Sequence, residues 1–225
     1  MRCAIISDIH SNLHALNVVL RDIDEQGVDE VLCAGDLVGY GAFPNEVIAQ
    51  IKERKIISIC GNHDRAVLNI DTSGMNPLAA KAVYWTAKQI SFEALGYLKK
   101  LKPRATLNLA GIPAAMFHGS VRNDDEYVYE EDAVPELLNL ARARVVISGH
   151  THVPYVKRYS EGVLLNPGSV GQPRDGDRRA SYLILDGDEM RFELRRLDYP
   201  VEEAAKAISA AGLPDFLGLR LLSGI

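Results

Sequence analysis

The sequence lacks the features of a membrane or secreted protein. No apolar run approaches the roughly 18 residues that a membrane span requires, and Met1–Ile6 leads directly into Ser7-Asp8 without a signal-peptide pattern. We therefore expect a soluble, cytoplasmic protein with no membrane partner. Domain linkers, internal repeats and low-complexity segments are also missing from the 225 residues, and we expect a single domain over residues 1–225.

Cysteine is scarce as well, and basic residues are fewer than acidic ones. Cys3, Cys33 and Cys60 form no CxxC pair, and each lies in or beside a short apolar run, so we expect reduced, buried thiols. The 25 Lys and Arg residues are outnumbered by 30 Asp and Glu residues, which gives a net charge of −5. This balance disfavours long nucleic acids as partners, because binding them depends on many Lys and Arg contacts to phosphates.

The first sixty residues repeat one pattern, an apolar strand followed by a polar turn and an amphipathic helix. We expect strands at 2–7, 31–34 and 55–60 and helices at 12–26 and 44–54. Ser11 is the expected N-cap of the first helix and Gly27 its stop. Strands that alternate with helices predict a largely parallel sheet covered on both faces.

The rest of the chain changes from helices to short strands. Helices are expected at 77–90, 92–101, 134–141 and 201–211. We expect the strands of this half to form a second sheet, and their predicted positions are 106–109, 114–118, 145–148, 153–159, 163–166, 182–186 and 190–196.

Five of the six histidines stand in compact polar motifs, each placed just after an apolar, strand-like run. In α/β sheets ligands bind outside the carboxyl ends of the strands, so these motifs are expected to meet at one place. Ala34-Gly35-Asp36 follows the second strand in the same way. The histidine motifs are Ser7-Asp8-Ile9-His10, Cys60-Gly61-Asn62-His63-Asp64, Phe117-His118-Gly119 and Ser148-Gly149-His150-Thr151-His152.

The spacing and chemistry of these residues indicate a metal site. In an extended backbone residues i and i+2 project to the same side, so Asp8 with His10, and His150 with His152, are each expected to point at one spot. Carboxylate, imidazole and carboxamide groups suit Mn, Fe, Zn, Ni or Co. Seven such residues are too many for one ion, whereas two divalent transition-metal ions about 3.5–4 Å apart would use them all.

The order of the motifs resembles the calcineurin-like metallophosphoesterase superfamily. The small chain, without an inserted cap domain, is similar to the compact bacterial YfcE-like branch, as is the segment Asn166–Arg174. The resemblance implies an α/β fold in which two mixed β-sheets face each other and helices flank them, a four-layer αββα sandwich.

The resemblance also implies a role for each motif residue. Asp36 would bridge the two metals, His63 would contact the phosphate and protonate the leaving oxygen, and Asp64 would orient His63. The ligands of one metal would be Asp8, His10 and His152, and those of the other Asn62, His118 and His150.

The expected activity is dimetal-dependent hydrolysis of a small phosphomonoester or phosphodiester. A metal-bound hydroxide would attack phosphorus, without a covalent enzyme intermediate. Asn12, Arg65 and Arg174 are candidate substrate contacts, although Asn12 equally suits the first helical turn, Arg65 suits pairing with a carboxylate, and Arg174 suits a solvated loop.

Other functions within the superfamily stay open at this point. One is a non-catalytic metal-binding scaffold, as in the retromer subunit that resembles this family; such scaffolds tend to lose ligands, and none is missing here. The others are a nuclease and a protein phosphatase acting on phosphoserine or phosphothreonine. Homo-oligomerisation is also left open.

Overall fold

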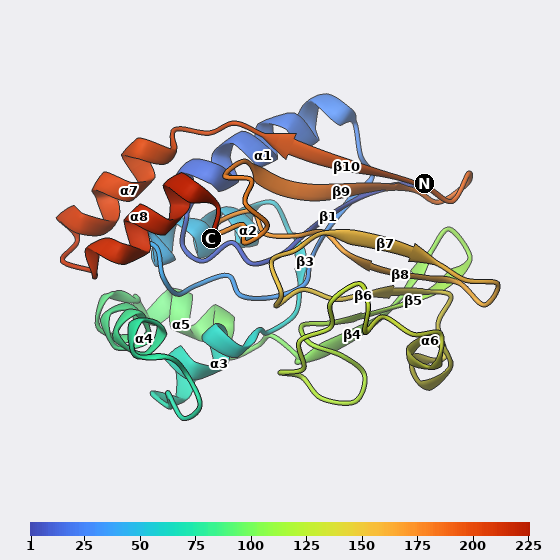
Figure 1. The fold of residues 1–225 in the computed structure, drawn as a ribbon, viewed down its shortest axis with the longest axis horizontal. Helices are drawn as coiled ribbons and strands as arrows, with labels where there is room; N and C mark the ends of the chain where they lie inside the picture. Colours follow the sequence, from blue (N-terminus) through green and yellow to red (C-terminus); the bar gives the residue numbers. More distant parts are fainter.

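Ten strands form two five-stranded sheets in the computed structural model, which describes all 225 residues (Figure 1). The first sheet has the order β10 (Arg191–Leu197), β9 (Ala180–Asp186), β1 (Arg2–Ile6), β2 (Glu30–Cys33) and β3 (Ile57–Ser58). The second has the order β4 (Arg104–Leu109), β5 (Ile112–Phe117), β6 (Val145–Ile147), β8 (Val163–Asn166) and β7 (Tyr155–Arg158). Each sheet contains both parallel and antiparallel pairs.

Eight helices accompany the sheets. They are α1 (Leu13–Gln26), α2 (Pro44–Glu53), α3 (Asn62–Asn69), α4 (Pro77–Gln89), α5 (Phe92–Leu98), α6 (Glu136–Ala141), α7 (Val201–Ala210) and α8 (Asp215–Ser223). None of them has both the length and the apolar character needed to cross a membrane.

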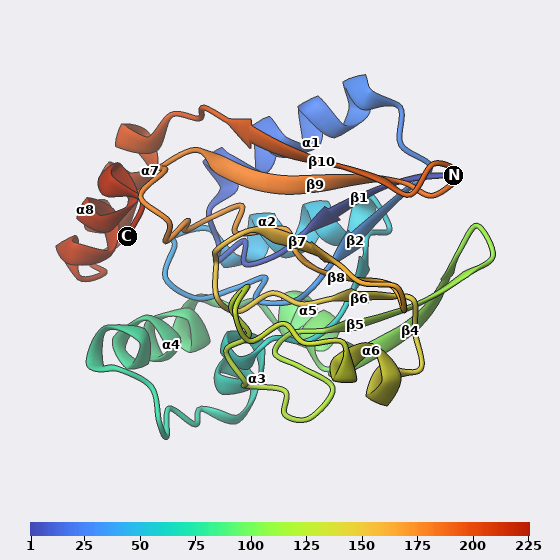
Figure 2. The same cartoon turned by 45° about the vertical axis from the view of Figure 1, so that its right-hand side comes forward.

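Three hydrophobic clusters separate the layers. Ile5 of β1 and Met116 of β5 belong to the cluster between the two sheets. Ile6 turns to the opposite face and joins the largest cluster, which packs the first sheet against helices that include α1. A third cluster packs the outer face of the second sheet against α6. Figure 2 shows these layers from α1 at the top to α6 at the bottom, and the predicted four-layer α/β architecture is confirmed.

The prediction that the strands of the second half form a separate sheet is wrong for β9 and β10. They form an antiparallel hairpin, and β9 pairs antiparallel with β1, with Ala4 opposite Ile184. The hairpin is drawn to this edge because Leu183 and Leu185 face the cluster between the sheets, while Ile184 packs into the cluster beneath the helices. The first sheet is therefore mixed rather than largely parallel.

Local details also differ from the prediction. Asn12, not Ser11, is the N-cap of α1, and its Oδ1 accepts a hydrogen bond from the Ala15 main-chain N at 3.1 Å. Gly27 ends α1, as predicted, and its backbone is left-handed. The third strand is only two residues long. Helices α3 and α8 were not predicted, because α3 begins inside the Gly-Asn-His-Asp motif and α8 is a short helix that contains Gly218.

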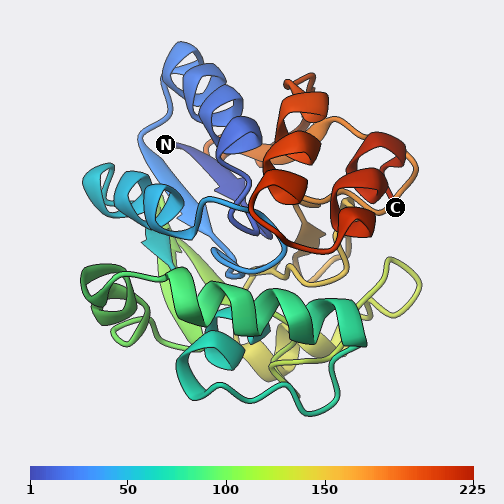
Figure 3. The ribbon, with the colours of Figure 1, turned by 90° about the vertical axis from the view of Figure 1, so that its left-hand side faces the viewer.

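The carboxyl ends of β1, β2, β5 and β6 lead into the loops that carry the predicted metal ligands. Figure 3 looks toward the end of the molecule where helices gather, with α7 and α8 in red on one side and α4 in green on the other. The fold therefore delivers polar side chains from four strands and from the start of α3 to one region.

Candidate metal centre

The seven predicted ligands converge, but not through extended backbone. The main-chain φ angles are 53° at Asp8, 49° at His10, 55° at Asp36, 68° at His150 and 61° at His152, so all five residues are left-handed. This corrects the prediction that paired side chains align because the backbone is extended. Left-handed residues other than glycine are strained, and such strain persists where the surrounding structure enforces it, often at functional sites.

Main-chain hydrogen bonds hold this unusual backbone. The N–H of Asp8 donates to the Gly35 oxygen and the N–H of His10 donates to the Asp36 oxygen, each at 3.0 Å. The loops that follow β1 and β2 are thus joined side by side. The side chains of Asp8 and Asp36 are both buried in this arrangement.

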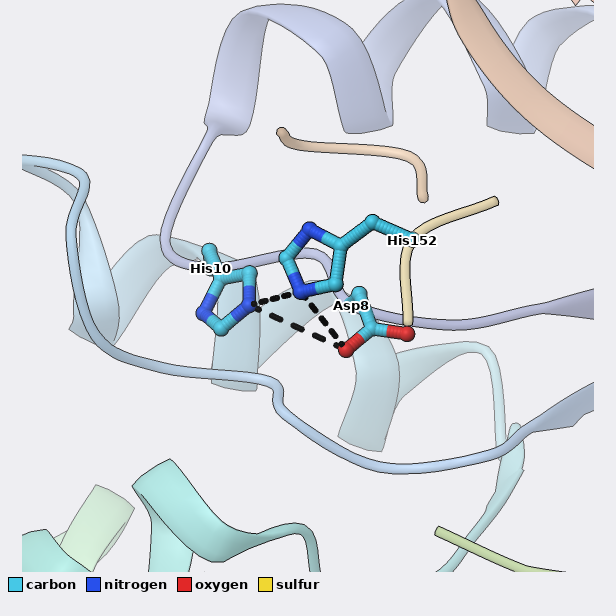
Figure 4. A group of neighbouring side chains, drawn as sticks. All are labelled: Asp8, His10 and His152. Atoms are coloured by element: carbon cyan, nitrogen blue, oxygen red, sulfur yellow. Dashed lines mark hydrogen bonds and ion pairs between the residues drawn. The ribbon is translucent and has the colours of Figure 1, made fainter. Parts of the chain in front are cut away.

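Asp8, His10 and His152 form the first group of side chains (Figure 4). The Nε2 atoms of the two histidines lie 3.1 Å apart, and Asp8 Oδ1 lies 3.2 Å from Nε2 of His152 and 3.8 Å from Nε2 of His10. The other oxygen of Asp8 accepts a hydrogen bond from the His150 main-chain N at 3.0 Å. Three possible ligand atoms therefore face a common point.

Asp36, His118 and His150 form the second group, and Asp36 also belongs to a third group with His10 and His63. Asp36 Oδ2 lies 3.3 Å from Nε2 of His118 and 3.6 Å from Nε2 of His10, so this carboxylate stands between the two sets of histidines. Asn62 is half-buried, and its Oδ1 lies 3.0 Å from Nε2 of His118.

The hydrogen bonds of the imidazole rings fit a bound metal. Nδ1 faces the main-chain oxygen of Val38 in His10, of Ala34 in His118 and of Gln172 in His152. A main-chain oxygen can only accept, so Nδ1 carries the proton of each neutral ring and Nε2 presents a lone pair to the cluster.

Asp8 Oδ1 supports the same fit. It is buried without a hydrogen-bond partner, which is costly for a polar atom unless a cation lies beside it. Imidazole nitrogens, carboxylate oxygens and an amide oxygen together are donors suited to divalent transition metals.

The carboxylates make the cluster attract positive charge. Burial opposes ionisation of Asp36, but the neighbouring His118, His63 and His10 together outweigh it and hold the pKa of Asp36 well below its usual value. Burial likewise disfavours the charged form of His118, but the charge of Asp36, a hydrogen bond to it and the charge of Asp8 raise the pKa of His118 to about 10. A divalent cation satisfies the same demand, and metal binding then releases such a proton.

His63 and Asp64 lie in the first turn of helix α3. The main-chain N of His63 donates to Asp36 Oδ1 at 2.8 Å, and its ring centroid lies 4.8 Å from that of His10. Its Nδ1 is buried without a partner, and burial lowers the pKa of the ring to about 4. Asp64 instead accepts hydrogen bonds from the main-chain N–H groups of Val38 (3.1 Å) and Gly61 (2.9 Å). It therefore fixes the loops around His63.

The three candidate substrate contacts occupy different positions. Asn12 is buried; besides capping α1, its Nδ2 donates to the Gly171 oxygen at 2.8 Å, so its polar atoms are used within the protein. Arg65 pairs with Asp125. Arg174 is half-buried, and its guanidinium carbon lies 5.9 Å from the Tyr40 ring centroid. Arg174 is therefore not part of a fully solvated loop.

A cavity of about 360 Å³ opens beside Asn62 and His150. Its wall includes Arg65 and Tyr127, and the Tyr127 ring lies over His150 with a centroid distance of 4.0 Å. The half-exposed Tyr127 belongs to the acidic loop that follows β5 and was not predicted as a site residue. No local motif marked it, because its position depends on how this loop folds over the second sheet.

Tyr40 is a second residue that the sequence analysis missed. Its ring centroid lies 4.4 Å from that of His63 and 4.7 Å from that of His10. Gly39 allows this approach: it is left-handed (φ +96°), and a Cβ there would lie 3.0 Å from Cγ of His63. The glycines on either side of Tyr40 were the available signal, because they indicate a tight loop close to other groups.

Comparisons with known proteins agree with this geometry. A family model described as the calcineurin-like phosphoesterase superfamily domain matches residues 1–190. The uncharacterized protein MJ0912 of Methanocaldococcus jannaschii is 38% identical over an alignment of 239 positions, which covers 98% of this chain and 97% of that protein. Phosphodiesterase YfcE of Escherichia coli K12 is 29% identical, over 84% of this chain and 89% of YfcE.

Solved structures show the same fold. A metallophosphoesterase from Sphaerobacter thermophilus superposes with a TM-score of 0.87 at 36% identity, covering 100% of this chain and 99% of that one. A family match over most of the sequence, together with these relatives, shows that the chain belongs to the calcineurin-like phosphoesterase superfamily, a family of metal-dependent phosphoric ester hydrolases.

Proposed function

We propose that this protein hydrolyses a small phosphomonoester or phosphodiester at a centre of two divalent transition-metal ions. The observation that carries this proposal is the position of Asp36, whose Oδ2 lies within 3.6 Å of Nε2 of both His10 and His118. One carboxylate placed between two sets of histidines is the arrangement that a pair of neighbouring ions needs.

In this proposal each set of side chains holds one ion. Asp8, His10 and His152 hold the first, and Asn62, His118 and His150 hold the second. Bound divalent ions would neutralise charge on the phosphoryl oxygens and make a water molecule acidic enough to act as a nucleophile near neutral pH. The protein contributes by fixing the donors: the Nδ1 protons of His10, His118 and His152, and the second oxygens of Asp8 and Asp36, are engaged by the main chain.

His63 is proposed to contact the phosphoryl group and to pass a proton to the leaving oxygen. Its ring lies beside those of His10 and Tyr40, and its Nδ1 has no partner within the protein. Asp64 is a positioning residue in this scheme, because it ties Val38 and Gly61 to the first turn of α3. No side chain of the cluster is needed as a covalent nucleophile.

The cavity beside Asn62 and His150 supports a small substrate. Its volume of about 360 Å³ lies at the lower end of the range for small-molecule sites. Arg65 faces it but is paired with Asp125, so it brings little net charge to an extended polyanion. We propose that this cavity receives the organic group on one side of the scissile phosphate.

The proposal is tested by measuring metal content and hydrolysis together. Protein loaded with Mn, Ni, Zn, Fe or Co is expected to hold close to two ions per chain and to hydrolyse p-nitrophenyl phosphate, bis(p-nitrophenyl) phosphate or both. Asp36→Asn should reduce turnover by at least about 100-fold. His14→Ala is the matched control, because His14 lies in α1 outside all three groups of possible ligands.

Two results would contradict the proposal. One is a protein that binds two ions and hydrolyses neither ester with any of these metals. The other is an Asp36→Asn variant that stays folded, by circular dichroism, and keeps the wild-type rate. The assigned role of His63 is tested separately: His63→Ala should lower the rate on phenyl phosphate, whose leaving group is less acidic, by a larger factor than on p-nitrophenyl phosphate.

A further inference from the structure

Two arginine side chains share one aromatic ring beside the metal-ligand cluster. The guanidinium carbons of Arg174, in the loop after β8, and of Arg220, in helix α8, each lie 5.9 Å from the ring centroid of Tyr40. Residues 46 positions apart in the sequence are thus brought to the same ring. No sequence motif connects them, and α8 itself was not predicted.

Neither arginine has a side-chain carboxylate partner. Arg174 Nη2 donates to Gln172 Oε1 at 3.0 Å, and its Nε is buried without a partner. Arg220 Nε donates to the main-chain oxygen of Ile225 at 2.5 Å, which leaves its two Nη atoms unused. By contrast, Arg178 in the same loop as Arg174 pairs with Glu202.

The two cations also repel each other. Burial, followed by the charge of Arg174, lowers the pKa of Arg220, while Tyr40 opposes this only weakly. Two guanidinium groups beside one ring, with no Asp or Glu side chain paired to either, are unfavourable in the free protein. A bound anion would remove both costs, because it would screen the repulsion and satisfy the free N–H donors.

The pair is fixed in place rather than loosely exposed. The Gly176 main-chain N, two residues after Arg174, donates to the Gly224 oxygen at the end of α8 at 2.9 Å. On the other side, the Gly41 main-chain N donates to the His10 oxygen at 2.9 Å, which ties the Tyr40 loop to the metal-ligand loop.

The two arginines stand at different distances from the metal-ligand cluster. Arg174 is linked to the cluster through Gln172: its Nη2 donates to Gln172 Oε1 at 3.0 Å, and the main-chain oxygen of Gln172 lies 2.5 Å from Nδ1 of His152. Arg220 instead hydrogen-bonds to Ile225 and meets the ring of Tyr40. Arg174 is therefore the arginine beside the metal-ligand loop, and Arg220 lies farther out. The ring of Tyr40 fills the space between them and His63.

We propose that Arg174 and Arg220, on the ring of Tyr40, bind a second phosphoryl group of the substrate, so that the preferred ester carries two phosphates. One phosphate would lie at the metal centre and the other at the arginine pair. The assignment rests on the proposed function. A second phosphoryl group fits better than a carboxylate, because two guanidinium groups offer donors and charge that match a dianion.

A matched pair of substrates tests this site on the metal-loaded protein. The p-nitrophenyl ester of thymidine 5′-phosphate and its 3′-phosphorylated derivative differ only in the second phosphate. We expect kcat/KM to be at least about tenfold higher for the 3′-phosphorylated ester. Arg220→Gln should reduce this ratio about tenfold or more, as loss of a charged hydrogen-bonding partner does. Arg178→Gln is the control, and it should leave the ratio unchanged.

A binding measurement separates this proposal from the proposed function. Isothermal titration calorimetry should show that thymidine 3′,5′-bisphosphate binds at least about tenfold more tightly than thymidine 5′-phosphate, with the difference lost in Arg220→Gln. If neither ester is hydrolysed but this difference is present, the proposed function fails and the second phosphate site stands.

The opposite results overturn the arginine site. If the ratio of kcat/KM between the two esters is near one in the wild type, or is unchanged in folded Arg220→Gln, the arginine pair does not bind a second phosphate. Inorganic phosphate provides the last arm of the test. If it binds in an Arg220-dependent way while the bisphosphate has no advantage over the monophosphate, the pair binds a free anion rather than part of the substrate.

Discussion

The Nε2 atoms of His10 and His152 face each other at 3.1 Å, while Nδ1 of each ring is directed to a main-chain oxygen, that of Val38 or Gln172. With both protons on Nδ1, two lone pairs point at each other in a buried site. The contact is unfavourable between neutral rings and becomes favourable when one cation lies within reach of both. The protein is thus arranged around a charge that its own side chains do not provide.

Metal binding is therefore expected to stabilise the fold. Adding Mn, Ni or Zn to chelator-treated protein should raise the melting temperature, and at a free metal concentration of 100 Kd the gain is about 2.7 kcal/mol. His152→Ala should lose most of this increase, because it removes one of the two facing rings. His14→Ala serves as the control and should keep it.

Differential scanning fluorimetry with elemental analysis measures both effects on the same samples. The expectation fails if chelator-treated wild-type protein melts at the same temperature with and without metal. It also fails if His152→Ala binds and responds to metal as well as His14→Ala does.

Gly61 and Asp36 meet so closely that the glycine has no room for a side chain. A Cβ at Gly61 would collide with Oδ1 and the main-chain N of Asp36, which belong to a buried carboxylate and to backbone that cannot move aside. Gly61→Ala should therefore displace Asp36 without changing any possible ligand. We expect metal content to fall and kcat/KM to drop at least about 100-fold.

Gly96→Ala provides the matched control in α5. A Cβ there would meet nothing within 4 Å, and alanine is favoured over glycine inside a helix by about 0.5–1 kcal/mol. Thermal melts, metal analysis and rates should separate the two variants. Normal metal content and activity in Gly61→Ala would show that Asp36 tolerates displacement.

The sequence was informative where one short stretch contains the whole signal. The apolar run at Arg2–Ile6 indicates a buried strand, and the polar residues that follow it lie at the carboxyl end where ligands gather. The same reasoning predicted that Asp36 and His118, which follow other strands, join this cluster. The convergence was predictable because each motif carries its own strand beside it.

Long-range packing was not predictable in the same way. The strand pattern of β9 is equally compatible with either sheet, and the choice depends on Ile184 and Leu185 filling two different clusters at once. Arg220 was missed for a related reason. Its contact with Tyr40 exists only because α8 folds back to the loop containing Gly176, and no local pattern encodes that return.

The local backbone of the site was also beyond the sequence pattern. Asp8 and His10 reach one spot from left-handed residues, whereas i and i+2 spacing alone predicts extended ones. Hydrogen bonds that Asp8 and His10 donate to the neighbouring loop after β2 impose this conformation, so the cause lies about 27 residues away in the chain.

Asp22 links the first helix to the β9–β10 hairpin, and its loss should be costly. Arg195 donates to Oδ1 at 2.7 Å and to Oδ2 at 3.1 Å, and the hydroxyl of Tyr182 also donates to Oδ2. Asp22→Asn should lower the free energy of unfolding by about 1–3 kcal/mol at pH 7, as expected for hydrogen bonds to a charged group.

Asp24→Asn is the control in the same helix, because Asp24 also pairs with an arginine but its side chain is 56% exposed, against 13% for Asp22. Asp24→Asn should lower the free energy of unfolding by less than about 1 kcal/mol.

The pH dependence of this difference follows from the direction of the pKa shift. Burial opposes ionisation of Asp22, but the hydrogen bonds from Arg195 and Tyr182 outweigh it, so the pKa of Asp22 in the folded protein lies below the ordinary value of 3.8. A depressed folded pKa stabilises the protein fully above the unfolded value, and this contribution is lost as the pH falls from there through the folded value. The difference in the free energy of unfolding between wild type and Asp22→Asn should therefore be constant from pH 7 to about pH 5 and become smaller below about pH 4. Urea unfolding curves at each pH measure it, and a gap that widened toward acid would mean that Asp22 is not held ionised by Arg195.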